Sequence, residues 1–148
     1  MPQVEFYVLP GTEERARLKL ACRLTERAYL AGERVFVALA DPAQLQTFDE
    51  MLWTFADRSF VPHEAYRDES QWQETPVLLG CDTQPRQCFD LLVNLREEMP
   101  PAYPLARRVT EIIDGDEPRR RAGRQRYRRY REQGLTPETR NIPAEQSP

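Results

Sequence analysis

Cysteine, histidine and glycine are scarce in this sequence, and each scarcity excludes a class of protein. The 148 residues include three cysteines, one histidine and six glycines. Cys22, Cys81 and Cys88 are odd in number and lack C-x-x-C spacing, so they predict no disulfide framework and fit a reducing cytosol. The single histidine, His63, excludes a histidine-rich metal site. We expect His63 to be a loop residue that makes local hydrogen bonds.

Long apolar runs are also absent. No segment approaches the roughly 18 apolar residues that a membrane-spanning helix needs. The first ten residues, MPQVEFYVLP, have neither a basic start nor a long apolar stretch, which argues against a secretory signal peptide. Hydrophobic residues make up 40% and charged residues 30% of the chain, a balance typical of a globular domain of this length. We therefore expect one cytoplasmic domain with no membrane contact.

The first strand-to-helix turn, residues 9–12, lacks the glycines of a nucleotide-binding loop. Its sequence, LPGT, matches neither G-x-G-x-x-G nor G-x-x-x-x-G-K-[ST]. A bound phosphate needs several converging backbone N–H groups, and proline removes one of them. The scattered acids also lack the alternating spacing of a calcium loop. The sequence thus predicts no cofactor, no metal and no catalytic site.

Strand-like and helical segments alternate along the chain. The run VFVALA at residues 35–40 is almost entirely apolar, which is typical of a central strand covered on both faces. Asp41 and Pro42 predict the start of a helix, because aspartate caps helices and proline is tolerated at the first helical position. Other strand-like runs cover 4–9, 76–79, 89–95 and 109–113, other helices follow Thr12 and Pro118, and residues 54–75 look irregular.

This alternation predicts the fold class. We expect an α/β protein, a three-layer α/β/α single domain with a mostly parallel central sheet. Its topology would be Rossmann-like without a nucleotide-binding loop. The domain is expected to cover residues 1–134, and residues 135–148 are polar and proline-bearing, which predicts a flexible C-terminal tail.

The charge is unevenly distributed. The net charge is only −3, yet residues 119–131 contain eight arginines and no acid. Residues 1–118 carry 12 basic and 21 acidic side chains. An acidic body with one concentrated cationic helix indicates an anionic partner, such as nucleic acid, a membrane surface or an acidic peptide.

Four of these arginines form a stripe along the predicted helix. Arg120, Arg124, Arg128 and Arg131 recur at helical spacing and share their face with Tyr127; Tyr130 lies at its edge. Like charges at this spacing repel one another, which favours an external anion, although a solvated basic face explains the pattern too. Arginine forks can bind carboxylates or phosphates, and a tyrosine among them adds an apolar wall.

The segment 51–62, MLWTFADRSFVP, is rich in aromatic residues outside the regular elements. Trp53, Phe55, Phe60 and Val61 surround a polar centre. Such residues commonly anchor protein–protein contacts. All four side chains could also be buried in the hydrophobic core. The sequence therefore leaves two interpretations of this segment open, a docking surface and a part of the core.

Several short segments together resemble the chi subunit family of bacterial DNA polymerase III. No single segment is specific, but their order and separations are, and the resemblance covers nearly the whole chain up to Gly134. The segments are Phe6-Tyr7-Val8-Leu9, Ala28-Tyr29, Arg34-Val35-Phe36-Val37, Asp49-Glu50-Met51-Leu52-Trp53, Ser59-Phe60-Val61-Pro62-His63, Val93-Asn94-Leu95 and Arg124-Gln125-Arg126-Tyr127-Arg128-Arg129-Tyr130-Arg131.

The resemblance implies a non-catalytic accessory subunit in DNA replication. Such a protein binds the psi subunit, which links it to the clamp loader, and some members use the same face for a helicase. It also binds the acidic C-terminal tail of single-stranded DNA-binding protein, which ends in an aromatic residue. By the resemblance, Trp53, Phe60 and Val61 belong to the psi face. The tail pocket would comprise Arg120, Arg124, Tyr127, Arg128 and Arg131.

Two other interpretations compete with this one. The basic helix could bind single-stranded nucleic acid directly, and the additional arginines Arg119, Arg121 and Arg129 leave such a contact open. Under the leading interpretation, by contrast, contact with DNA is mostly indirect. A small α/β enzyme is the third, and the missing phosphate loop and lone histidine argue against it.

Overall fold

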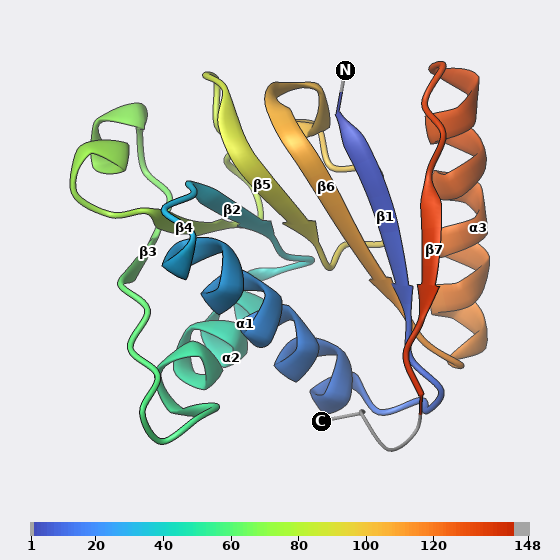
Figure 1. The fold of residues 1–148 in the computed structure, drawn as a ribbon, viewed down its shortest axis with the longest axis horizontal. Coiled ribbons are helices and arrows are strands. Elements are labelled where there is room, and N and C mark those ends of the chain that lie inside the picture. Colours follow the sequence, from blue (N-terminus) through green and yellow to red (C-terminus); the bar gives the residue numbers. More distant parts are fainter. Residues whose placement is uncertain (1, 144–148) are drawn as a thin grey trace.

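A computed structural model describes residues 2–143 as one parallel sheet with helices on both faces (Figure 1). Helices α1 and α2 pack on one face, and α3 packs on the other. The predicted α/β class with a parallel sheet is confirmed. The helices are α1 (Glu14–Leu30), α2 (Pro42–Thr54) and α3 (Glu117–Glu132), with short 3-10 turns η1 (Glu69–Gln73) and η2 (Tyr103–Leu105).

The sheet has seven strands in the order β3-β4-β2-β5-β6-β1-β7, and every neighbouring pair is parallel. Its centre is the most apolar part, since all residues of β2 and β4 are buried. A strand covered on both faces needs this continuous run of apolar side chains. The strands are β1 (Gln3–Val8), β2 (Val35–Ala38), β3 (His63–Ala65), β4 (Val77–Gly80), β5 (Phe89–Asn94), β6 (Ala106–Ile113) and β7 (Glu138–Asn141).

Helix α2 begins as the sequence predicts. The Asp41 side chain accepts a hydrogen bond from the Gln44 backbone N–H at 2.8 Å, and Pro42 occupies the first turn. The Gln44 side chain reaches back to the Ala40 N–H at 2.7 Å, one residue earlier than a capping box requires. The helix expected after Thr12 is α1, whose cap position is held by Glu13 without a side-chain hydrogen bond.

The predicted flexible tail is wrong for residues 135–143. Leu135 is buried, and Glu138–Asn141 forms β7, which pairs with β1 at the edge of the sheet. Arg140 forms an ion pair with Glu5 that holds this strand. The strand escapes sequence reasoning because its four residues, ETRN, are polar and all exposed. Residues 144–148 of the predicted tail lie outside the described residues.

The region predicted to be irregular contains two short elements, β3 and η1. An Asp68 capping box starts η1, in which Gln71 closes the reciprocal hydrogen bond.

In the described part of the chain, no helix is long and apolar enough to cross a membrane.

Candidate functional site

A groove of about 660 Å³ lies between α3 and the edge of the sheet formed by β1 and β7. Four of the five residues predicted for the tail pocket line it, namely Arg124, Tyr127, Arg128 and Arg131. The fifth, Arg120, is exposed on α3 but does not line the groove. The remaining lining residues come from four elements and are Phe6, Val8, Ile113, Gly123, Glu132 and Thr139.

The floor of the groove is apolar. The Tyr127 ring packs at 5.3 Å from that of Phe6, and its hydroxyl donates to the Pro137 carbonyl at 3.4 Å. Gly123 lets α3 approach β6 closely, because a Cβ at this position would lie 2.7 Å from Cγ2 of Ile113. The glycine therefore lets the backbone of α3 lie directly against Ile113, which also lines the groove.

Arginines form the rim of the groove. Arg124, Arg128 and Arg131 are all exposed. Arg124 approaches Glu117 at 3.9 Å, a loose surface pair of little strength. Across residues 2–143, neither Arg128 nor Arg131 forms an ion pair. Their guanidinium groups are thus available to a carboxylate or phosphate beside an apolar floor.

A buried polar network, which sequence reasoning missed, anchors α3 to the sheet. Arg126 donates from Nε to Glu111 at 2.9 Å and from Nη1 to the Glu97 carbonyl at 2.8 Å. The Tyr130 hydroxyl donates to the other Glu111 oxygen at 2.7 Å, and the Asn94 amide donates to both. Burial raises the pKa of Glu111, and the Arg126 charge opposes that rise. Tyr130, predicted at the edge of the stripe, is instead fully buried.

Arg119 also has a structural role. It donates to both oxygens of Asp114, at 3.0 and 2.8 Å, and pairs with Glu14 at 3.1 Å. The hydrogen bonds with Asp114 raise the pKa of Arg119. The donors of Arg119 are thus engaged within the protein, which argues against the direct DNA contact that the sequence leaves open for this residue.

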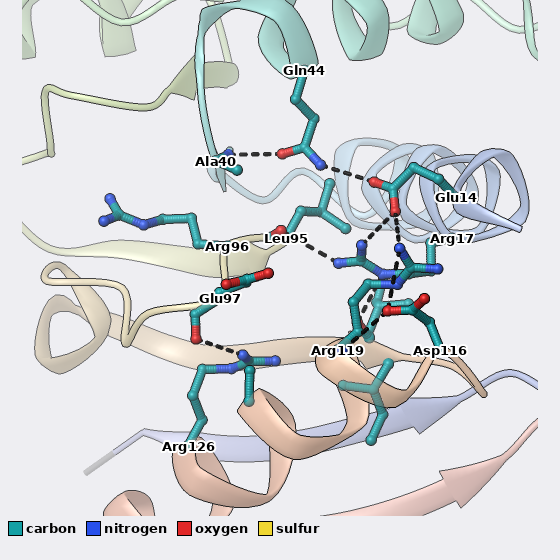
Figure 2. A pocket seen from close by; sticks show the side chains of 13 residues that line it. Glu14, Arg17, Ala40, Gln44, Leu95, Arg96, Glu97, Asp116, Arg119 and Arg126 are labelled. Atoms are coloured by element: carbon teal, nitrogen blue, oxygen red, sulfur yellow. Dashed lines mark hydrogen bonds and ion pairs between the residues drawn. The ribbon is translucent and has the colours of Figure 1, made fainter. Parts of the chain in front are cut away.

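A second, smaller pocket of about 170 Å³ lies at the carboxyl ends of β2, β5 and β6. Nucleotides bind at this edge in many parallel α/β proteins. Figure 2 shows that the guanidinium groups of Arg17 and Arg119 both point at the carboxylate of Glu14, which also accepts from Gln44 at 2.9 Å. Arg17 further donates to the carbonyls of Ile112 and Leu95.

These contacts connect the first turns of all three helices across the pocket. Burial lowers the pKa of Arg17, and the charge of Glu14 opposes that shift. The acids around the pocket neutralise its arginines, so we assign it a structural role. Among the residues described, no cluster of three His, Cys, Asp or Glu side chains could hold a metal ion.

The second predicted surface lies at the end of α2. Trp53 is 41% exposed and Phe60 is 67% exposed, and their rings lie 5.4 Å apart. Val61 is fully buried in the core, so its predicted place on this surface is wrong. The imidazole of His63 packs against the indole of Trp53, with ring centroids 4.0 Å apart. One of its hydrogen bonds, with the Val61 carbonyl, is local as we expected, but the other is with the Asp49 carbonyl in α2. His63 is also the first residue of β3 rather than a loop residue.

Comparison with known proteins points to one family. The family described as DNA polymerase III chi subunit, HolC, matches residues 1–138. A DNA polymerase III subunit chi from Pseudomonas aeruginosa is 38% identical over 143 residues, which cover 97% of this chain and 99% of that protein. Its counterpart in Haemophilus influenzae is 26% identical over 138 residues, which cover 93% and 96%. The Escherichia coli protein is 24% identical over 117 residues, which cover 79% and 80%.

Solved structures of low sequence identity share the fold. The C-terminal domain of the DEAD-box protein Dbp5 has a TM-score of 0.58 at 9% identity, over 93% of this chain and 90% of that chain. T4 UvsW has a TM-score of 0.60 at 9% identity, over 94% of this chain but only 41% of that chain. At this identity the likeness concerns the fold alone.

Proposed function

Because this chain belongs to the DNA polymerase III chi subunit family, HolC, we propose that it links two partners during DNA replication. It is an accessory subunit of the replicative polymerase. One partner is the psi subunit, which connects it to the clamp loader. The other is the acidic C-terminal tail of single-stranded DNA-binding protein. The chain itself catalyses no reaction under this proposal.

The groove beside α3 is the observation that carries the tail-binding proposal. Arg124, Arg128 and Arg131 can bind the carboxylates of an acidic peptide through forked hydrogen bonds. The floor made by Phe6, Gly123 and Tyr127 can accept an aromatic side chain at the end of that peptide. A ligand with both features matches both parts of the groove.

The aromatic pair at the end of α2 supports the psi-binding proposal. Aromatic side chains are enriched in protein–protein interfaces, and the exposed rings of Trp53 and Phe60 lie 5.4 Å apart. Helices α2 and α3 lie on opposite faces of the sheet (Figure 1), so the two partners can bind at the same time. A helicase that used the aromatic surface would compete with psi and not with the tail.

Calorimetric titration of the tail peptide tests the groove. Arg124→Ala should lower the affinity at least tenfold, about 1.4 kcal/mol, because it removes one guanidinium group from the rim of the groove. Arg128→Ala and Tyr127→Ala should act in the same direction. Arg86→Ala is the control, since Arg86 is equally exposed but lies outside the groove.

A peptide that lacks its terminal aromatic residue should bind poorly to every variant. Affinity for the full peptide should fall as salt rises, because the charges are screened. It should persist at moderate salt, because the aromatic ring contributes an apolar term. Equal affinities of wild type and Arg124→Ala would remove the groove from the binding site.

Absence of catalysis is tested separately. The purified chain should show no polymerase, nuclease or ATPase turnover. Turnover that a point substitution in this chain abolishes would overturn that part of the proposal.

A further inference from the structure

We propose that the outward side of α3 binds single-stranded nucleic acid through Arg120, Arg121 and Arg129. These three arginines do not line the groove, and the inference does not depend on the proposed tail binding. Its ligand is the phosphate backbone, contacted without preference for base sequence.

The first observation is that the eight arginines of α3 have different surroundings. Arg119 and Arg126 are engaged within the protein. Three more line the groove, namely Arg124, Arg128 and Arg131. Arg120, Arg121 and Arg129 remain, and all three are exposed. Within residues 2–143, these three form no ion pair, and they line neither the groove nor the smaller pocket.

The directions of the three side chains are the second observation. At 3.6 residues per turn, Arg120, Arg121 and Arg129 spread over roughly half of the helix circumference. Along the axis they cover roughly 14 Å. Such diverging charges cannot converge on one carboxylate. They can contact successive phosphates of a strand that runs along or across the helix.

The uneven distribution of charge on the protein favours nucleic acid over other anionic partners. No acid interrupts residues 118–131, whereas residues 1–118 have an excess of nine acids. A broad anionic membrane surface would meet that acidic body, but a thin flexible strand can follow one helix and avoid it. An acidic peptide needs apolar contacts for specific binding, and those lie in the groove, which the three arginines do not line.

Fluorescence anisotropy with a labelled oligothymidylate of about 20 nucleotides, a length sufficient for an OB-fold-sized site, tests the proposal. The variant Arg120→Gln/Arg121→Gln/Arg129→Gln keeps good helix formers and removes three charges. The control Arg23→Gln/Arg58→Gln/Arg86→Gln removes three charges from exposed arginines outside α3. The two variants thus have the same net charge.

Wild type should bind the oligonucleotide at low salt, with affinity falling steeply as salt rises. The α3 variant should bind at least tenfold more weakly, and its slope of log affinity against log salt should be smaller by about 2, since each phosphate contact contributes about 0.7. The control should bind within twofold of wild type. Arg121→Gln/Arg129→Gln, which keeps all four arginines of the stripe, should bind the tail peptide within twofold of wild type.

Three results would overturn the proposal. The first is absent oligonucleotide binding by wild type at low salt. The second is an equal loss of affinity in the control, which would show that only the net charge matters. The third is retained oligonucleotide binding with loss of tail-peptide binding in Arg121→Gln/Arg129→Gln, which would assign these arginines to the peptide site. Because the oligonucleotide is titrated without peptide, failure of tail binding leaves the proposal standing.

Discussion

The indole of Trp53 stacks on the imidazole of His63, with ring centroids 4.0 Å apart and planes inclined by 38°. His63 is itself fixed on both sides, by the Val61 carbonyl at 2.6 Å from Nδ1 and by Asp49 Oδ1 at 2.9 Å from Nε2. The imidazole therefore joins α2 to the start of β3. This connection holds Trp53 in place while leaving its outer face exposed beside Phe60.

The Trp53–Phe60 surface gives the first prediction. Trp53→Ala or Phe60→Ala should weaken psi binding by about 2 kcal/mol or more, the scale of an interface hot spot. Stability should change little, because both side chains are exposed. Affinity for psi, measured by calorimetry, and urea unfolding of the free chain are the two readouts.

Val61→Ala is the matched contrast. It should destabilise the fold by about 2 kcal/mol, since it deletes buried methyl groups. In conditions where it remains folded, psi affinity should be close to that of wild type. A Trp53→Ala variant that unfolds while keeping its affinity for psi would make the aromatic pair a core element.

Gly123 gives the second prediction. Alanine is the better helix former by about 1 kcal/mol, but its Cβ would lie 2.7 Å from Cγ2 of Ile113. That methyl group belongs to a stiff β-branched side chain, so α3 must move away from β6. Gly123→Ala should therefore give no net gain in stability and should weaken tail-peptide binding several-fold.

Gln125→Ala is the control for this change. Gln125 is exposed on the same helix, so its substitution should leave both stability and peptide affinity nearly unchanged. Thermal unfolding and peptide titration of both variants decide the matter. A clear stability gain in Gly123→Ala with unchanged affinity would show that the close approach of α3 is unimportant.

Local signals in the sequence were sufficient for most of the fold. Asp41 with Pro42 marks the start of α2, and the apolar run at Val35 marks a central strand, because capping and burial act on neighbouring residues. Strand β7 could not be predicted, because its side chains face solvent and only its backbone pairing with β1 places it.

Part of the candidate site could also be predicted from local patterns in the sequence. Helical spacing brings Arg124, Tyr127 and Arg128 to one face, and the structure places them together in the groove. The same spacing cannot tell which arginines turn inward. Arg126 is engaged by Glu111 on β6, which the tertiary fold brings near, and Arg119 is engaged by Asp114 in the turn that precedes α3.

The buried pair of Arg126 and Glu111 gives the third prediction. Arg126→Met leaves the Glu111 carboxylate buried without its counter-charge, which should cost about 3 kcal/mol or more. The double variant Arg126→Met/Glu111→Gln should lose less stability than Arg126→Met alone, because it leaves no buried charge unpaired. Urea unfolding at neutral pH compares the two. An equal or larger loss in the double variant would mean that the unpaired charge is not the source of the cost.

The cost in Arg126→Met should depend on pH. Burial raises the pKa of Glu111, and removal of Arg126 removes the charge that opposes this rise. A carboxyl whose pKa is higher in the folded state destabilises the fold once it ionises and ceases to do so when it is protonated. The stability difference from wild type should therefore shrink as pH falls from 8 toward 5. A difference that stays constant over this range would contradict the assignment.

Cys22 gives the last prediction, which concerns both reactivity and stability. Burial raises the pKa of the Cys22 thiol to about 12, whereas Cys88 is exposed. Because the thiolate is the reactive form, a thiol reagent at pH 8 should modify Cys88 readily and Cys22 only after unfolding.

In the unfolded chain the Cys22 thiol ionises near pH 8.5, so the unfolded state loses a proton before the folded state does. The contribution of Cys22 to stability is thus complete below about pH 8.5 and should be lost as pH rises toward 12, by up to about 1.4 kcal/mol per unit. Cys22→Ala lacks this proton and should lose less stability between pH 8 and 10 than wild type does. Rapid labelling of Cys22 in the native protein would show that its thiol is not shielded by the core.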